Sequence, residues 1–391
     1  MSGDASVPLG PAASPRLLLD ATAVPADRGG VGRYVDALVP ALVAAGARLV
    51  VACQERDAAL LAGLAPAAEV VTAPGPAARV PVRLAWEQAG LPALARRTGA
   101  QVLLSPHYTM PVRAPLPVVV TLHDATFFSH PELHSPVKAR FFRAATRLAV
   151  RRAGALVVPS AATRDEVLRH VGGPGARAER FHVAHHGVDR TVFHPADEDA
   201  QRRLRERLGL GTRPYVAFLG TLEPRKNVPA LVRAWARVAA THPDRPALVL
   251  AGGPGWDGDV EPAIAAVPPG LTVLRTGYLP LPELAPLLSG AAVVAYPSLG
   301  EGFGLPVLEA MACGATVLTT RELSLPEVGG DAVAYCGTDE ASVAQGLAAL
   351  LDDAAAPARL RAAARQRAAL FTWDAAARVH LAAASAALAG G

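Results

Sequence analysis

Short, continuous apolar runs alternate with longer stretches of helical periodicity along almost the whole chain. Typical runs are RLLLDA (16–21), RLVVAC (48–53) and PVVVTLHD (117–124). Apolar strands of this kind are expected in a parallel sheet that helices cover on both faces. The alternation of strand and helix therefore predicts an α/β chain with doubly wound parallel sheets.

The alternation occurs in two series, separated by the polar segment HPADEDAQRRLRERLGLGTRP (194–214). The first series contains further apolar runs at 101–105, 155–160 and 180–187 and helical patterns near 31–45, 136–153 and 162–171. The second series contains apolar runs at 215–220, 247–253, 272–278, 292–298, 315–320 and 332–337 and helical patterns from Val228, at 282–289 and from Leu305.

We therefore expect two Rossmann-like domains of similar size, one over 15–195 and one over 213–370. A last helix, at about 373–388, is expected to return to the first domain, and residues 1–14 are expected to form a disordered leader. Ligands of such sheets bind beyond the carboxyl ends of the strands. Two facing sheets would therefore form a ligand-binding cleft between the domains.

The composition argues against a membrane-spanning, secreted or disulfide-rich protein. Apolar residues make up 51% of the chain, which is enough for a large core, but no run of 18 or more apolar residues could span a membrane. The N-terminus lacks the basic start and the apolar segment of a signal peptide. Cys53, Cys313 and Cys336 stand far apart, which predicts buried thiols with no metal or disulfide role. These features predict a cytoplasmic protein.

Positive charge is concentrated in the first half of the chain. Residues 1–205 hold 24 Lys and Arg against 17 Asp and Glu, a net charge of +7, whereas residues 206–391 have a net charge of −3. The basic half is expected to meet an anionic partner. Aromatic residues are only 5% of the chain, too few for an obvious base-stacking platform, so nucleic acid is not the expected partner.

Four arginines recur at helical spacing in the predicted helix 136–153. They are Arg140, Arg143, Arg147 and Arg151. On a helix they form one stripe, with Phe141 among the residues expected on the opposite side. The stripe is either the solvated face of a packed helix or a peripheral contact with anionic lipid at the inner face of a membrane.

Glycines open the first predicted helix, in the stretch DRGGVGRY (27–34). Gly30 and Gly32 would let the backbone approach a ligand, and the free amides of a helix N-terminus attract anions. A plain tight turn explains the same glycines equally well, because the stretch lacks the full G-x-G-x-x-G spacing.

His123 directly follows the apolar run PVVVTL, at the ligand-binding edge of the predicted sheet. It is either a hydrogen-bond donor to a substrate or a structural histidine. His185 and His186 also follow a strand, and we expect both to be structural.

Two adjacent cations, Arg225 and Lys226, follow the run YVAFLGTL in the sequence EPRKN (223–227). An arginine fork and a lysine point charge at a strand-to-helix turn suit a diphosphate. An ordinary solvated loop is the alternative, although the position at the end of a strand argues against it.

The stretch SLGEGFGLPVLEAMACG (298–314) joins the run AVVAYPS to a predicted helix that begins at Leu305. Its glycine-rich loop, 300–304, is expected to present consecutive backbone amides to an anion or to sugar hydroxyls. Glu301 lies in the loop and Glu309 lies just over one turn into the helix. Ionised carboxylates only accept hydrogen bonds, so both suit the hydroxyl groups of an elongated ligand.

The sequence EGFGLPVLE (301–309) resembles the E-x7-E signature of the retaining, nucleotide-sugar-dependent glycosyltransferases of family 4. The resemblance extends to Gly29–Gly32, His123 and 225–227, and so covers nearly the whole chain. It implies the GT-B fold, which has two facing Rossmann-like domains, with the active site between them and no metal or other cofactor.

The resemblance also implies a role for each matching residue. Catalytic roles fall to Glu301, His123, Arg225 and Lys226, with Glu301 and His123 at the donor sugar and the two cations at the diphosphate. The other donor-binding residues that it implies are Gly30, Gly32, Tyr278, Gly302, Phe303, Gly304, Leu305 and Glu309. Among these, Glu309 would hold the ribose, the loop amides would hold sugar and phosphate, and the loops near Tyr278 and Leu222 would select the base.

The segments 223–227 and 324–332 resemble bacterial mannosyltransferases of cell-surface polysaccharide assembly. We therefore expect transfer of a sugar, such as mannose from GDP-mannose, to a glycan or lipid-linked acceptor. A nucleotide-sugar epimerase of the same fold and a non-catalytic protein that binds anionic surfaces remain alternatives. The binding-protein alternative leaves Glu301 and Glu309 unexplained, and an oxidoreductase would need the missing dinucleotide motif.

Overall fold

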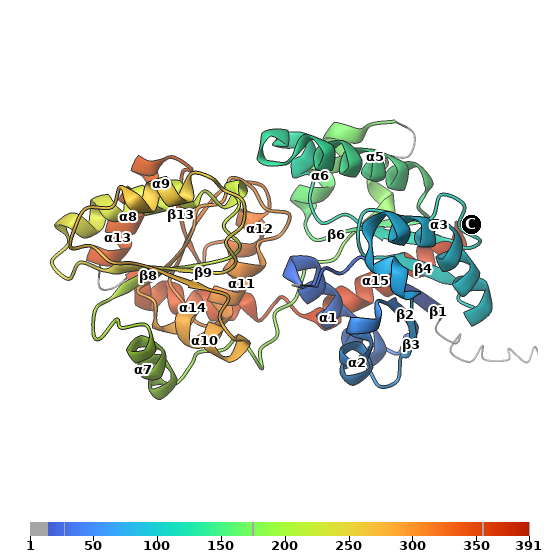
Figure 1. Ribbon diagram of the computed structural model, residues 1–391, viewed down its shortest axis with the longest axis horizontal. Coiled ribbons are helices and arrows are strands. Elements are labelled where there is room, and N and C mark those ends of the chain that lie inside the picture. The colour runs from blue at the N-terminus through green and yellow to red at the C-terminus, as the bar shows by residue number, and fades with distance from the viewer. Residues whose placement is uncertain (1–14, 27, 174–175, 354–355, 391) are drawn as a thin grey trace, which may run out of the picture. The chain divides into compact units, whose positions relative to one another are not determined.

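The computed structural model describes residues 15–26, 28–173, 176–353 and 356–390 (Figure 1). The leader expected at 1–14 lies outside these residues. Contacts divide the chain into two compact units, each described by itself. The first unit contains the described residues up to Thr121, Leu148–Val157, and the described residues from Ala377 on. The second unit contains Leu122–Arg147 and Val158–Ala376.

The first series of apolar runs forms a seven-stranded sheet. Its strands are β1 (Arg16–Asp20), β2 (Arg48–Cys53), β3 (Glu69–Thr72), β4 (Val102–Ser105), β5 (Val118–Thr121), β6 (Ala155–Val158) and β7 (Phe181–Val183). The helices of this part of the chain are α1 (Gly29–Ala44), α2 (Glu55–Leu64), α3 (Val80–Thr98), α4 (Thr126–Ser129), α5 (Pro136–Arg152) and α6 (Ala161–Val171). The strand order is β3-β2-β1-β4-β5-β6-β7.

The second series forms a six-stranded sheet within the second unit. Its strands are β8 (Tyr215–Leu219), β9 (Ala247–Ala251), β10 (Val273–Gly277), β11 (Val293–Tyr296), β12 (Val317–Thr320) and β13 (Ala334–Cys336). The helices from this point on are α8 (Val228–Thr241), α9 (Val260–Ala265), α10 (Leu281–Gly290), α11 (Leu305–Ala312), α12 (Leu325–Gly329), α13 (Glu340–Asp352), α14 (Ala356–Ala368) and α15 (Trp373–Ala389).

The second sheet has the order β10-β9-β8-β11-β12-β13, and its strands run parallel. Helices α8, α9 and α13 cover one face and α10 and α14 the other (Figure 1). The order reverses between β8 and β11, which pair directly through Val216 and Val293. Segments that leave the carboxyl ends of these two strands therefore meet at the point where doubly wound sheets bind ligands.

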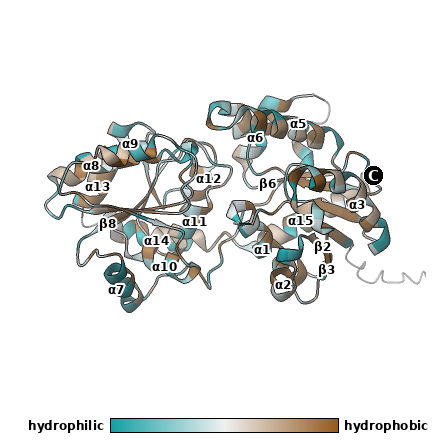
Figure 2. Ribbon diagram, viewed as in Figure 1, coloured by the Kyte–Doolittle hydropathy of each residue, from teal (hydrophilic) through white to brown (hydrophobic). Residues whose placement is uncertain are grey.

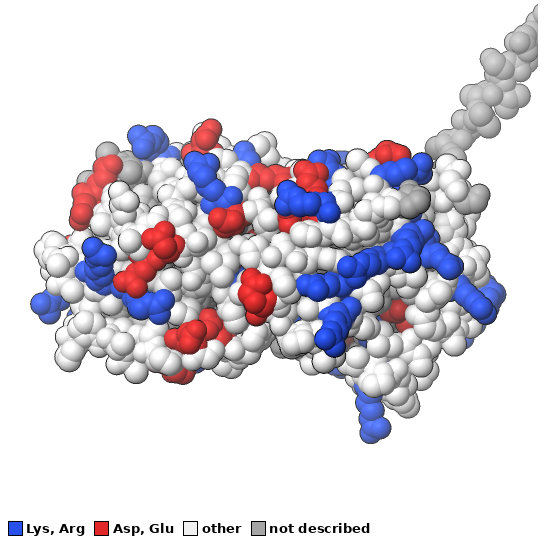
Figure 3. All heavy atoms as spheres, turned by 90° about the horizontal axis from the view of Figure 1, so that it is seen from above, with Lys and Arg blue, Asp and Glu red and all other residues white. Residues whose placement is uncertain are grey.

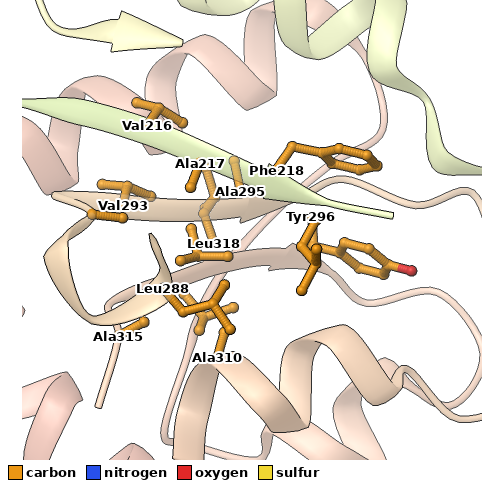
Figure 4. Close-up of a cluster of buried hydrophobic side chains, with 14 of the residues drawn as sticks. Val216, Ala217, Phe218, Leu288, Val293, Ala295, Tyr296, Ala310, Ala315 and Leu318 are labelled. Carbon is orange, nitrogen blue, oxygen red and sulfur yellow. The ribbon is translucent and has the colours of Figure 1, made fainter. Parts of the chain in front are cut away.

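The core of the second unit is built from the apolar strands and the helix faces that cover them. Figure 4 shows Val216, Phe218, Ala295 and Leu318 of the strands packed with side chains of α10 and α11. Tyr296 belongs to the same cluster, and its ring stacks on that of Phe218. Its hydroxyl points away from the other labelled side chains, so this residue connects the core to polar groups at the strand end.

The predicted α/β class with two parallel, doubly wound sheets is confirmed. The polar segment between the two series contains a further helix, α7 (Glu198–Arg207), whose N-cap Asp197 accepts a hydrogen bond from the Ala200 amide at 2.6 Å. Figure 2 shows α7 as strongly hydrophilic. Strand β3 and helices α2 and α3 were not predicted; β3 is a half-exposed edge strand with too few apolar residues to be recognised. The domain boundaries near 195–213 stay a prediction.

Candidate active site

The glycine-rich loop leaves the carboxyl end of β11 and leads into α11. Gly304 caps the helix with φ of 99°, a left-handed conformation that favours glycine, and Pro306 sits in the first turn where no amide hydrogen is needed. The loop thus makes an abrupt turn from strand to helix at the switch point of the sheet.

Glu301 lies in this loop with only 6% of its surface exposed. One carboxylate oxygen accepts hydrogen bonds from Lys226 Nζ at 2.7 Å, Ser298 Oγ at 2.7 Å and the Tyr296 hydroxyl at 3.0 Å. The other oxygen accepts from Arg225 Nη1. Burial by itself would raise the pKa of Glu301, but the charges of Arg225 and Lys226 outweigh it and lower the pKa to about 2.

Arg225 and Lys226 form a short 3-10 turn, Pro224–Lys226, directly beyond β8. The turn is tied to the glycine-rich loop, because the Leu299 amide donates to the Arg225 carbonyl at 2.9 Å. Lys226 is only 7% exposed, and burial together with the charge of Arg225 lowers its pKa. These two cations therefore belong to a buried site and not to the solvated loop considered above.

Two acids balance the two cations of this cluster. Arg225 Nη2 donates to Glu223 Oε1 at 2.7 Å, and its Nη1 also donates to the Gly300 carbonyl at 2.9 Å. Burial opposes the charge of Arg225, but Glu301 and Glu223 together raise its pKa well above the usual value. The cluster is thus a neutral, hydrogen-bonded network that fixes both cations next to the loop amides.

His123 also lies against the glycine-rich loop. A Cβ added at Gly302 would come within 1.8 Å of the His123 carbonyl oxygen, so the two backbones are in close contact. The His123 ring is 6.2 Å from that of His186, which in turn packs 4.9 Å from Phe303 and stacks on Trp373 at 5.5 Å.

The remaining predicted residues are placed as follows. Glu309 is 2% exposed within α11. Gly30 and Gly32 lie in α1 of the first unit. A Cβ at Gly32 would come within 2.8 Å of the Arg28 Cβ, whereas one at Gly30 would meet nothing within 4 Å. Packing thus accounts for a glycine at position 32, where a side chain would be too close to Arg28. It does not account for the glycine at position 30.

A pocket of about 280 Å³ lies at the carboxyl ends of β8, β9 and β10. It is lined by Leu222, Leu250, Gly252, Pro254, Arg275 and Gly277. Tyr278, which is 64% exposed, follows the last of these residues and lies over Gly253. The predicted base loops at Leu222 and Gly277 therefore contribute to one pocket, whose lining is both polar and apolar.

Several residues around the loop were not predicted. Tyr296 and Ser298 bind the Glu301 carboxylate, Ser324 Oγ donates to the Glu301 carbonyl at 2.8 Å, and Ser160 and Thr163 bind the Gly302 carbonyl. Only Ser160 carried a sequence signal, as a serine placed to cap the helix that follows the run ALVVP.

The comparisons with known proteins agree with this geometry. The family described as "Glycosyltransferase Family 4" matches residues 28–192, and "Glycosyl transferases group 1" matches residues 213–353. The chain is 32% identical over 275 residues to O-antigen chain mannosyltransferase B of Escherichia coli, which corresponds to 69% of this chain and 70% of that protein. The chain belongs to glycosyltransferase family 4.

This glycosyltransferase has further relatives in sequence and structure. It is 37% identical over 223 residues to a D-inositol 3-phosphate glycosyltransferase of Mycobacterium avium, a match that spans 54% of this chain and 50% of that protein. The structure of Anabaena HepE in complex with UDP and glucose superposes with a TM-score of 0.71 at 20% identity, covering 92% of this chain and 95% of that one. At such identity the likeness shows the fold alone, and it confirms the GT-B class.

Proposed function

We propose that this glycosyltransferase transfers a hexose from a nucleotide sugar, with retention of configuration, to a glycan or lipid-linked acceptor. The observation that carries the proposal is the buried Arg225–Lys226–Glu301 cluster at the start of α11. Breaking the sugar–phosphate bond builds negative charge on the departing diphosphate. Two fixed cations and a helix N-terminus stabilise that charge without a proton donor.

The same cluster supports transfer without a metal ion. In the proposed reaction Arg225, Lys226 and the loop amides compensate the diphosphate charge that a divalent cation compensates elsewhere. Glu301 holds both cations in place through its ion pairs and directs its remaining acceptor capacity to the donor sugar. His123, whose backbone touches Gly302, would complete the sugar site.

The pocket beside Leu222 and Gly277 supports binding of a nucleotide base. Its mixed polar and apolar lining and its volume of about 280 Å³ suit one flat heterocycle with hydrogen-bonding edges, with Tyr278 beside it. The relative named O-antigen chain mannosyltransferase B favours mannose as the sugar. We propose GDP-mannose as the donor.

A thermal-shift screen with GDP, UDP and ADP tests the proposal. We expect one of the three to raise the melting temperature selectively, because a ligand at 100 times its Kd adds about 2.7 kcal/mol of stability. Tyr278→Ala should reduce that shift, whereas Phe141→Ala, another exposed aromatic, should not. Equal shifts with all three nucleotides, or none with any, would contradict a nucleotide-specific donor site.

We also propose that α5 contacts an anionic membrane from the cytoplasmic side, which would bring the enzyme to a lipid-linked acceptor. Arg140, Arg147 and Arg151 are exposed, and Figure 3 shows basic side chains gathered in a row on this face. Val137 is 79% exposed and Phe141 is 39% exposed, and the Phe141 ring lies 5.2 Å from that of Phe142. Such a mixed face suits the boundary between head groups and acyl chains.

Arg143 differs from the other three arginines. It is half-buried and donates from Nε to the Phe127 carbonyl at 2.5 Å, whereas Arg147 is exposed although its guanidinium lies 5.2 Å from the Phe128 ring. Arg143 therefore packs within the protein, and the lipid contact is assigned to the other three. None of the helices in the described part of the chain combines the length and apolar character that a membrane-spanning segment needs.

Vesicle sedimentation tests the lipid contact. Changing Arg140, Arg147 and Arg151 together to alanine is expected to abolish binding to vesicles with anionic lipid at low salt, since each charge contributes about 1 kcal/mol. The matched control changes three exposed arginines of α7, Arg202, Arg203 and Arg207, and should leave binding unchanged. Binding that survives the α5 changes would refute the contact.

A further inference from the structure

Three consecutive carbonyl groups of the glycine-rich loop are each held by a side chain. The Gly300 carbonyl accepts from Arg225, and the Glu301 carbonyl accepts from Ser324. The Gly302 carbonyl accepts from both Ser160 Oγ at 2.7 Å and Thr163 Oγ1 at 3.0 Å. A carbonyl oxygen has two lone pairs, so it can accept both hydroxyl groups at once.

Ser160 and Thr163 belong to the start of α6, far from the loop in sequence. Ser160 is the N-cap of the helix, and its Oγ accepts from the Thr163 amide at 3.0 Å. Ser160 is fully buried and Thr163 is 3% exposed. The first two amides of the helix, those of Ala161 and Ala162, have no acceptor within the helix and donate to the carboxylate of Glu327 at 2.9 and 3.2 Å. The N-terminal end of α6 is thus hydrogen-bonded both to the glycine-rich loop and to Glu327 of α12.

The anchored carbonyl sets the direction of the next amide. In a planar trans peptide unit the C=O and the following N–H point in opposite directions. Holding the Gly302 carbonyl toward α6 therefore turns the Phe303 N–H away from α6. In the described part of the chain the amides of Glu301, Gly302 and Phe303 donate no hydrogen bond to protein groups. They therefore remain available as donors at the start of α11.

We infer that Ser160 and Thr163 are positioning residues, whose hydroxyl groups aim the Phe303 amide at an acceptor oxygen of the nucleotide sugar. The inference rests on the proposed function. The oxygen belongs either to the diphosphate or to a sugar hydroxyl, and both offer the same hydrogen-bonding chemistry.

The positioning role can be tested apart from helix capping, because only the positioning role uses the Thr163 hydroxyl. Capping uses the Thr163 backbone amide and the Ser160 oxygen as acceptor, and neither needs the Thr163 hydroxyl. Thr163→Val keeps the shape of the side chain and removes its donor to Gly302, together with the 3.0 Å contact between Thr163 Oγ1 and Ser160 Oγ. Thr163→Ser restores the donor and serves as the conservative rescue.

Calorimetric titration of the unmodified enzyme, Thr163→Val and Thr163→Ser tests the inference. The probes are GDP, UDP and ADP and the hexose esters of whichever binds. We expect Thr163→Val to weaken binding about three- to ten-fold, because one neutral hydrogen bond is lost, and Thr163→Ser to restore it. Loss with the free nucleotide and the ester assigns the oxygen to the diphosphate; loss with the ester alone assigns it to the sugar.

Two further measurements exclude a general structural effect. The KM for the donor should rise in Thr163→Val while the KM for the acceptor stays constant. Ser160→Asp, which keeps an acceptor for the Thr163 amide but has no proton for the Gly302 carbonyl, should weaken donor binding in the same way even if Thr163→Val folds poorly. Asp197→Ala, which removes the exposed cap of α7, is the control and should not change donor binding.

The outcomes separate the two proposals. If the unmodified enzyme binds none of the nucleotides, the proposed function is wrong and the inference falls with it. If the unmodified enzyme binds one of them and both Thr163→Val and Ser160→Asp bind it equally well, the proposed function stands and the positioning role is overturned.

Discussion

Replacing Glu301 by glutamine is expected to lower the free energy of unfolding by about 3–5 kcal/mol and to reduce sugar transfer at least about 100-fold. The amide is similar in shape but carries no charge. Arg225 and Lys226 would then remain buried side by side without the carboxylate that both contact. Chemical denaturation and a donor-dependent transfer assay measure the two effects.

The control for this change is Glu340→Gln. Glu340 pairs with Arg233 at 3.1 Å, but both side chains are more than 40% exposed. A solvent-exposed pair contributes only about 0–1 kcal/mol, so this variant should remain close to the unmodified enzyme in both assays. Similar losses of stability and activity in both variants would show that the buried cluster contributes no more than an exposed ion pair does.

The pH dependence gives an independent check on the Glu301 charge. The folded pKa, about 2, lies below the ordinary value of 4.5, so the carboxylate stabilises the fold above about pH 4.5. That contribution is lost as the pH falls from about 4.5 toward 2. The difference in unfolding free energy between the enzyme and Glu301→Gln should therefore shrink over this range, and a constant difference would contradict the assigned charge.

Gly302→Ala is expected to reduce kcat/KM at least about 100-fold and to lower the free energy of unfolding by about 1–3 kcal/mol. The added Cβ would lie 1.8 Å from the His123 carbonyl oxygen and 2.9 Å from the Asp124 Cβ. Because the closest of these atoms belongs to the backbone, the loop has to move and its amides lose their alignment. Steady-state kinetics and thermal unfolding measure the result.

Gly63→Ala is the matched control for this change. Gly63 lies in α2, where an added Cβ would meet nothing within 4 Å. Alanine favours a helix over glycine, so this variant should be as active as the unmodified enzyme and no less stable. An unimpaired Gly302→Ala enzyme would rule out the close contact between the loop and His123.

The sequence by itself determined the class of fold and the position of the charged groups. Continuous apolar runs between helical patterns predicted two parallel sheets, because strands covered on both faces need apolar side chains at every position. Residues that follow such runs lie at the carboxyl edge of a sheet. For this reason Arg225, Lys226 and Glu301 could be placed at the ligand-binding edge of a sheet, and the resemblance to family 4 assigned them to one site, before their contacts were known.

Only the tertiary structure decided which groups hold that site together. The Ser160 hydroxyl and the Gly302 carbonyl are 142 positions apart, and the backbones of Gly187 and Trp373 approach so closely that a Cβ on the glycine would lie 2.1 Å from the Trp373 nitrogen. Periodicity reports which face of a segment is buried, but not which distant segment covers it. That choice depends on how strands pair and helices pack throughout the unit, and no local spacing encodes it.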